Sequence, residues 1–190
     1  MKGLTMKKLK YGVLAFMLVL VMGLSACSRN LAGQYYAYDK SSGITELTIK
    51  KVSNGENQVV LTPVTGNKSQ AKIKQYLRGL YDKYQIEEAK KQAEMLKDVN
   101  YQGKIVKKDQ TVTFKSQQIG TQKFAGGPVP FETQKDKIIL RTNKSESLTF
   151  YKKGSQQQEK LAKKFQKIEK QLIDKTYQNF TAKVKIKKAE

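Results

Sequence analysis

The sequence predicts an α+β domain, in which an antiparallel sheet or partial barrel of about seven strands carries an inserted helical hairpin and a C-terminal amphipathic helix. Three observations lead to this fold class. Short segments on both sides of the chain's middle have apolar residues at every second position and are separated by turn residues. The middle and the end instead carry apolar residues at helical spacing. About 160 residues follow the N-terminal apolar run, which is a single-domain length that can bury one core.

Three strands are expected before the middle of the chain. Tyr36 and Tyr38 share one face of the first, and Leu47 and Ile49 alternate with polar residues in the second. Pro63 should end the third strand or place it at an edge. We expect the three strands at residues 33–39, 45–50 and 58–64. Turn segments rich in Asp, Ser, Gly and Asn separate them.

The middle of the chain predicts two helices that fold back on each other. Ser69 is a plausible N-cap for the first helix, whose apolar stripe is Ile73, Leu77, Leu80 and Tyr84. The second stripe, Ile86, Ala89, Ala93 and Leu96, lies on nearly the opposite side of a continued helix. A break near residues 84–86 would therefore produce a helical hairpin that covers the sheet.

Strand patterns then return, followed by a last helix. Two hairpins are expected from residues 101–107 with 111–114 and from 137–141 with 147–151, while the Gly- and Pro-rich stretch 124–131 indicates a loop before a short strand. Leu161, Phe165, Ile168 and Leu172 then form the apolar stripe of a lysine-rich amphipathic helix. The tail from Ala182 to Lys188 alternates like an edge strand protected by lysines, and a disordered basic end is the alternative.

The N-terminus has the regions of a bacterial export signal. Residues 1–10 are basic, residues 11–23 are apolar or small, and Leu24-Ser25-Ala26-Cys27 follows them. This motif resembles the lipobox of bacterial lipoproteins. The resemblance implies cleavage before Cys27 and a diacylglyceryl group on its sulfur, and two acyl chains are enough for stable membrane attachment. The expected organisation is a signal peptide (1–26), a lipidated tether (27–32), one domain (33–175) and a basic tail (176–190).

The remaining residue types argue against an enzyme. The chain has no His, and with Cys27 lipidated it has no free thiol, which excludes His-based triads, cysteine nucleophiles and zinc sites built from these ligands. Glu87 and Glu88 point to different faces of a helix, while Asp39, Asp109 and Asp136 fall in predicted turns. We therefore expect no catalytic residue, no metal ligand and no cofactor.

Charge is the strongest functional signal. Removing the signal's four lysines and no acid from the formal +21 leaves +17 on the mature chain. A solvated lysine surface would explain this, and so would attraction to an anionic lipid, an envelope polymer or an envelope protein. The tether, residues 28–32, can reach only about 17 Å, so the domain should stay close to the membrane. Export argues against nucleic acid as the partner, although the charge would suit it.

Two functions follow. The first is a non-enzymatic surface lipoprotein that binds an anionic envelope or membrane partner. The alternative is a small-ligand carrier, loosely similar to lipocalin-like domains, with a pocket lined by Tyr36, Leu47, Ile49 and Phe114. The Lys-rich, Arg-poor composition is typical of a low-GC Gram-positive bacterium, where the anchor would hold the domain on the extracellular face of the cytoplasmic membrane. In a bacterium with two membranes, Ser28 after the cysteine resembles the pattern of outer-membrane lipoproteins.

Overall fold

The described part of the chain forms a barrel with helices attached. The computed structural model describes residues 30–52, 56–119, 122–124, 126–142 and 146–183. The chain divides into two units, residues 1–31 and 32–190, and only Asn30 and Leu31 of the first are described. The predicted signal and Cys27 therefore lie outside the described residues. Every described strand and helix belongs to the second unit.

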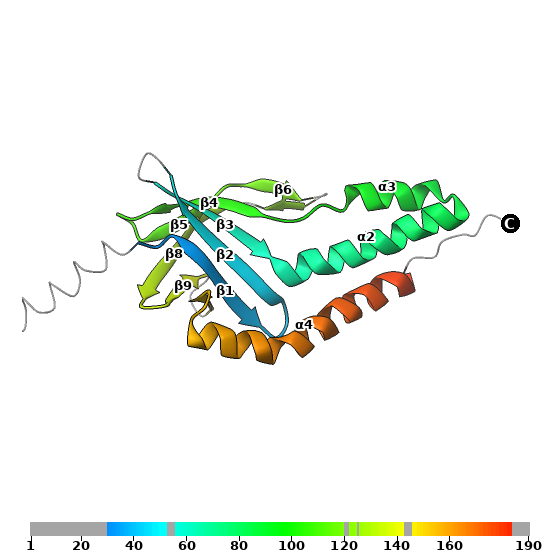
Figure 1. Cartoon of the computed structure of the whole chain (residues 1–190). Helices are drawn as coiled ribbons and strands as arrows, with labels where there is room; N and C mark the ends of the chain where they lie inside the picture. Colours follow the sequence, from blue (N-terminus) through cyan, green and yellow to red (C-terminus); the bar gives the residue numbers. More distant parts are fainter. Residues whose placement is uncertain (1–29, 53–55, 120–121, 125, 143–145, 184–190) are drawn as a thin grey trace, which may run out of the picture. The chain divides into compact units, whose positions relative to one another are not determined.

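Eight antiparallel strands close into a barrel, in the order β1-β10-β9-β8-β5-β4-β3-β2 (Figure 1). Each barrel strand pairs with the next barrel strand along the chain, even across the insertions between β3 and β4 and between β5 and β8, and β10 returns to pair with β1. Closure removes both sheet edges, so every strand has partners on two sides. The strands are β1 (Gly33–Asp39), β2 (Gly43–Lys51), β3 (Asn57–Pro63), β4 (Tyr101–Val106), β5 (Thr111–Phe114), β8 (Gly127–Gln134), β9 (Lys137–Arg141) and β10 (Ser147–Lys152).

The barrel core follows from strand alternation. Inward positions carry large apolar side chains, and Leu47 and Phe150 have no exposed surface. An eight-stranded barrel has an interior that such side chains can fill. The buried apolar residues of the strands are Tyr35, Ala37, Leu47, Ile49, Val59, Ile105, Val112, Phe114, Phe131, Ile138, Leu140 and Phe150.

The α+β class is confirmed, but the barrel is closed and has one more strand than the sequence indicated. The additional strand is β8, which starts at Gly127 within the stretch that the sequence predicted to be a loop. Prolines 128 and 130 are compatible with a strand because their nitrogens, which have no N–H to donate, face a side that is unpaired at these positions. The N–H of Phe131 donates to the Gln110 carbonyl on the β5 side, so both proline nitrogens face the β9 side, where pairing begins only at Phe131.

Helices α2 (Val64–Tyr84) and α3 (Glu87–Met95) are inserted between β3 and β4 and are called here the helical extension. The predicted break is confirmed at Gln85, whose φ of 54° ends α2 in the left-handed region. The predicted N-cap is wrong, since α2 begins at Val64. The Ser69 hydroxyl instead donates to the Thr65 carbonyl inside the helix, 2.9 Å away.

A second, smaller apolar cluster holds the helical extension together. Ile73 and Leu77 of α2 are buried against Ala89 and Ala93 of α3. The small alanine side chains allow the two helix backbones to approach closely. Partly buried side chains complete the cluster: Tyr76, Leu80, Ile86, Leu96, Tyr177 and Phe180.

The C-terminal helix α4 (Gln156–Lys183) packs on both the barrel and the helical extension. Phe165 is buried and its ring lies 5.3 Å from that of Tyr38 on β1, while Tyr177 meets Tyr76 of α2 edge to face. The helix runs past the predicted domain boundary at residue 175, so residues 176–183 are helical rather than strand or disordered tail. Burial of Tyr177 and Phe180 against α2 explains the extra turns. Residues 184–190 lie outside the described residues.

One hairpin had no counterpart in the sequence analysis. Strands β6 (Gln117–Ile119) and β7 (Gln122–Phe124) pair with each other between β5 and β8 and form a separate two-stranded sheet. Three-residue strands are too short to show an alternating pattern, which is why sequence periodicity did not predict them.

Candidate functional site

Three of the four proposed pocket residues are buried in the barrel, and one is not. Leu47, Ile49 and Phe114 belong to the core. Tyr36 pairs with Glu46, whereas its neighbour Tyr35 pairs with Leu47 and is buried. Tyr36 therefore lies on the outer face, because residues opposite each other across a ladder share a face. Partial burial and a hydrogen bond with Glu46 raise the pKa of Tyr36 to about 12.

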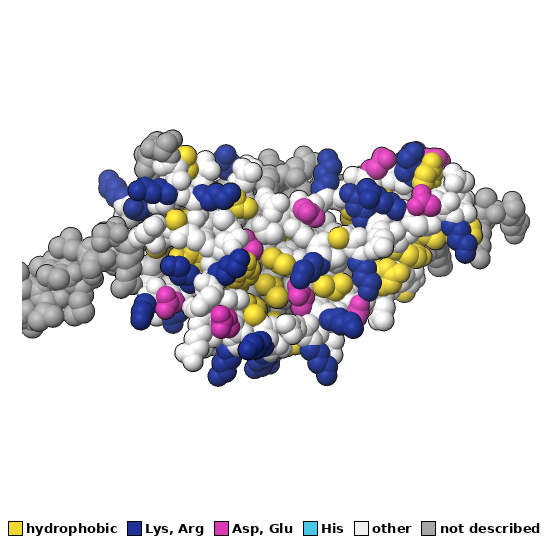
Figure 2. Space-filling model, viewed as in Figure 1, with side chains coloured by type: hydrophobic (Ala, Val, Ile, Leu, Met, Phe, Trp, Pro, Cys, Tyr) yellow, Lys and Arg dark blue, Asp and Glu magenta, His cyan; other side chains and the backbone are white. Residues whose placement is uncertain are grey.

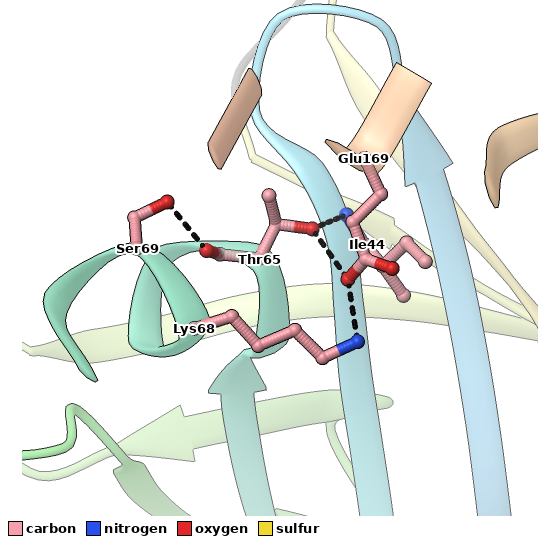
Figure 3. Close-up of polar contacts among 5 residues, drawn as sticks. All are labelled: Ile44, Thr65, Lys68, Ser69 and Glu169. Atoms are coloured by element: carbon pink, nitrogen blue, oxygen red, sulfur yellow. Dashed lines mark hydrogen bonds and ion pairs between the residues drawn. The ribbon is translucent and has the colours of Figure 1, made fainter. Parts of the chain in front are cut away.

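A polar node joins β2, α2 and α4 (Figure 3). The Thr65 hydroxyl accepts the N–H of Ile44 at 2.9 Å and donates to a Glu169 carboxylate oxygen at 3.3 Å. Lys68 Nζ lies 2.9 Å from the same oxygen. Gly43 permits this arrangement, since its φ is +84° and a Cβ there would be 2.4 Å from the Thr65 hydroxyl oxygen. The node fixes where the helices leave the barrel.

The two acids in the middle of α4 are both neutralised by lysines of α2. Glu169 pairs with Lys68, and Asp174 pairs with Lys72 at 2.6 Å. The Lys72 hydrogen bond lowers the pKa of Asp174, and the same ammonium group lies 4.8 Å from the Tyr177 ring centroid. The Glu169 side chain is mostly buried at this contact, whereas Asp174 stays 40% exposed and also lies within electrostatic reach of Lys170 on its own helix.

Six exposed lysines make the outer side of α4 basic, and we call it the α4 lysine face. Among the described residues, none of its lysines forms an ion pair. Glu159, in the first turn of α4, is an exposed acid at the start of this face. Figure 2 shows basic side chains along the lower edge, where α4 lies in Figure 1. The face consists of the exposed residues Lys160, Lys163, Lys164, Lys167, Lys170 and Lys175.

A second basic surface lies at the end of the barrel where β1 begins, and we call it the lysine rim. The antiparallel register brings the ends of β2, β4, β8 and β10 to this rim together with the start of β1. Three acids, Glu56, Asp109 and Asp136, lie at the same end. The rim's exposed basic residues are Lys50, Lys51, Lys107, Lys108, Lys135, Lys152 and Lys153.

The opposite end of the barrel has a different chemistry. Its β1–β2 turn is built on Asp39, whose carboxylate accepts the backbone N–H groups of Ser41 and Ser42 at 2.8 Å. The hydroxyl and backbone hydrogen bonds from these serines lower the pKa of Asp39 to about 2. Arg141, at the end of β9, pairs with Glu132. The lysine doublets are therefore a property of one end of the barrel.

The lysine rim was not predicted, although the sequence carries a signal for it. The doublets at 50–51, 107–108 and 152–153 each close or directly follow a predicted strand. Strands at even steps along a meander end on the same side of the sheet, so doublets on such strands meet there. Closure of the barrel places the doublets at 50–51 and 152–153 on either side of β1, because β1 pairs with both β2 and β10.

A groove lies along α2 beside the α3–β4 connection. Its volume is 810 Å³, and its charged residues are of both signs. The Gln70 side-chain oxygen is buried without a hydrogen-bond partner among the described residues, and Lys74 donates to the Leu96 carbonyl at 3.3 Å. The groove is lined by Gln70, Ala71, Lys74, Gln75, Arg78, Gly79, Asp82, Leu96, Lys97 and Asp98.

Within the described ranges, no group of three or more His, Cys, Asp or Glu side chains is arranged to hold a metal ion. None of the described helices is long and apolar enough to cross a membrane. No protein-family model, curated protein or solved structure matches the chain.

Proposed function

We propose that the protein is a non-enzymatic lipoprotein, anchored through Cys27 on the outer face of the membrane, that binds an anionic polymer of the cell envelope through the α4 lysine face. The carrying observation is a row of six exposed lysines on α4 that form no ion pair among the described residues, while Glu169 and Asp174 pair with lysines of α2. A phosphate-bearing polymer supplies repeated negative charges that suit such a row of lysines.

The spacing of the lysines supports an extended ligand. Lys160, Lys164 and Lys167 recur at steps of four and three residues, so they lie on one side of the helix. A helix rises about 1.5 Å per residue, which makes the stretch from Lys160 to Lys175 about 22 Å long. Several charges of a linear polyanion would be in contact at once, and weak individual contacts would add up.

The anchor is tested by intact mass. The wild-type chain from membranes of an expressing bacterium should begin at Cys27 and carry the diacylglyceryl group. A Cys27→Ala variant should lose the lipid and be released. A wild-type chain with an unmodified thiol would overturn the anchored part of the proposal.

The binding surface is tested with poly(glycerol phosphate) as the probe and two charge-matched variants. Because an exposed ionic contact contributes about 0.3–1 kcal/mol, K160Q/K163Q/K164Q/K167Q should weaken binding at least about tenfold at low salt. The control, K51Q/K107Q/K108Q/K135Q, removes the same charge from the lysine rim and should change affinity by less than about threefold. Equal losses in both variants would show that net charge, not the α4 lysine face, governs binding.

Small-ligand carriage is the second candidate. Closure of eight antiparallel strands favours it, since barrels of this size include those that hold one small ligand. It ranks second because Leu47 and Phe150, which point inward, are already fully buried. Saturable binding of an apolar fluorophore that Leu47→Ala strengthens would support it, and absence of binding to the wild type would reject it.

A further inference from the structure

We propose that the lysine rim binds the anionic phospholipid headgroups of the membrane that holds the anchor, and so orients the domain with its helical extension away from the bilayer. This inference rests on the proposed lipid anchor but not on the α4 lysine face. Its occupant is the lipid surface itself rather than a polymer or a protein.

The chain enters the barrel at the lysine rim. Gly33 begins β1, and Gln34 is in direct contact with the rim, because its carbonyl accepts the Lys153 N–H at 2.8 Å. The Lys153 ammonium group also donates to the Gln34 side chain at 2.9 Å. The point of attachment and the rim are therefore the same end of the barrel.

The tether between Cys27 and the barrel is short. Five residues separate Cys27 from Gly33. Fully extended, they span about 17 Å. An anchor on Cys27 then keeps the entry point within that distance of the headgroups, and the rim lysines around it lie within reach of the negative surface potential, which falls off within about 8–10 Å at physiological salt.

The surface around the entry point is strongly basic. Seven exposed lysines and three acids occupy the rim. Among the described residues, none of these lysines takes part in an ion pair. The doublets come from turns on different sides of the barrel, so the charge surrounds the entry point instead of lying on one flank.

The helical extension begins at the end of the barrel opposite the lysine rim. Helix α2 starts after Pro63, which pairs with Thr45 at the opposite end of β2 from Lys51. Thr65 of α2 contacts Ile44 at that same end. With the rim on the lipid, the start of the helical extension faces away from the membrane, and the groove along α2 stays open to the surroundings.

The test uses the full lipidated chain inserted into preformed vesicles. Vesicles of phosphatidylcholine alone are compared with vesicles that contain phosphatidylglycerol, and each lysine's rate of acetylation is followed by mass spectrometry. Lys51, Lys107, Lys108 and Lys135 should react about threefold more slowly on the anionic vesicles. Lys160, Lys163, Lys164 and Lys167 are internal controls and should react equally on both. About 1 M salt should abolish the difference.

The variants sharpen the result. K51Q/K107Q/K108Q/K135Q should remove the protection of Lys152 on anionic vesicles, while K160Q/K163Q/K164Q/K167Q should leave it unchanged. Protection of the α4 lysines in place of the rim would overturn the inference and place that helix on the lipid. Equal reactivity on both vesicle types would also overturn it.

Failure of the anchor gives a separate signature. A chain without lipid would not float with phosphatidylcholine vesicles, which would reject both the anchored function and the inference that rests on it. A chain that floats with both vesicle types but shows no rim protection rejects the inference alone.

Discussion

The barrel and the helical extension are stabilised by different kinds of packing. In the barrel, twelve buried apolar side chains come from all eight strands, and every strand is paired on both sides. In the helical extension, the apolar cluster has four buried side chains, Ile73, Leu77, Ala89 and Ala93, and they come from two helices. The barrel therefore holds one closed core, whereas the extension depends on a thin cluster and on its contacts with α4.

The contrast indicates where each region tolerates change. A closed barrel loses its core as a whole, because no strand can leave without exposing two neighbours. Helices packed through a small cluster can open locally at a free energy below that of global unfolding. The basic surfaces proposed for binding then differ as well, since the lysine rim lies on the rigid region and the α4 lysine face spans both.

The largest effect is expected in the barrel core. Phe150→Ala removes the largest fully buried side chain and should lower the free energy of unfolding by about 3–5 kcal/mol, because a cavity remains among strands that cannot collapse around it. Chemical denaturation measures the loss. Phe150→Leu is the control and should cost about 1 kcal/mol. A loss below 1 kcal/mol for Phe150→Ala would contradict the closed, filled interior.

The next effect tests whether the helical extension opens independently. Leu77→Ala removes a side chain that is 1% exposed and should cost about 2–4 kcal/mol. Hydrogen exchange should accelerate mainly in α2 and α3, while amides of β2 and β10 keep their protection. Uniform acceleration across both regions would show that the barrel and the extension form one cooperative unit.

A smaller effect is expected at the junction of the two regions. Gly43→Ala places a Cβ 2.4 Å from the Thr65 hydroxyl oxygen at a φ of +84°, and should destabilise the protein by about 2 kcal/mol. Gly79→Ala is the matched control, because it lies in α2 with open space around it and should stabilise by about 0.5–1 kcal/mol. Thermal unfolding separates the two, and the same sign for both would contradict the close approach at Gly43.

The smallest effect is the pH dependence of the β1–β2 turn. The folded-state pKa of Asp39 is depressed to about 2 from an ordinary value near 3.8, so its contribution is present above about pH 4 and is lost as pH falls through about 2. The difference in stability between wild type and Asp39→Asn should therefore shrink over that window. Because the turn is exposed, only a few tenths of a kcal/mol are expected. A constant difference from pH 6 to pH 2 would refute the assignment.

Much of the fold followed from periodicity. Strands β1, β2, β3, β4, β5, β9 and β10 and the break after Tyr84 all carry local signals, namely alternation, hairpin turns or a switch of the apolar stripe. Strand β8 and the β6–β7 hairpin were missed, because prolines and very short strands carry no such signal. Tyr36 was assigned to the interior because two aromatics on one face suggested the core face, whereas register decides which face is inward.

The candidate surfaces divide in the same way. The basic outer side of α4 was visible from lysines opposite an apolar stripe, but the neutralisation of Glu169 and Asp174 required knowledge of where α2 lies. The lysine rim required the closed order of the strands, since residues 51 and 152 are distant in the chain and meet at one end only through the β1 pairings.

The sequence by itself determined the α+β class, the identity of most elements, the surplus of lysines and the motif at Cys27. Composition and patterns among residues close together in the chain are enough for each of these. Tertiary structure decided the closure of the barrel, the inward face of β1, the length of α4 and the gathering of lysines at one end. Those features depend on pairings between residues far apart in the chain, and local preference carries no information about which distant partner a strand or helix will meet.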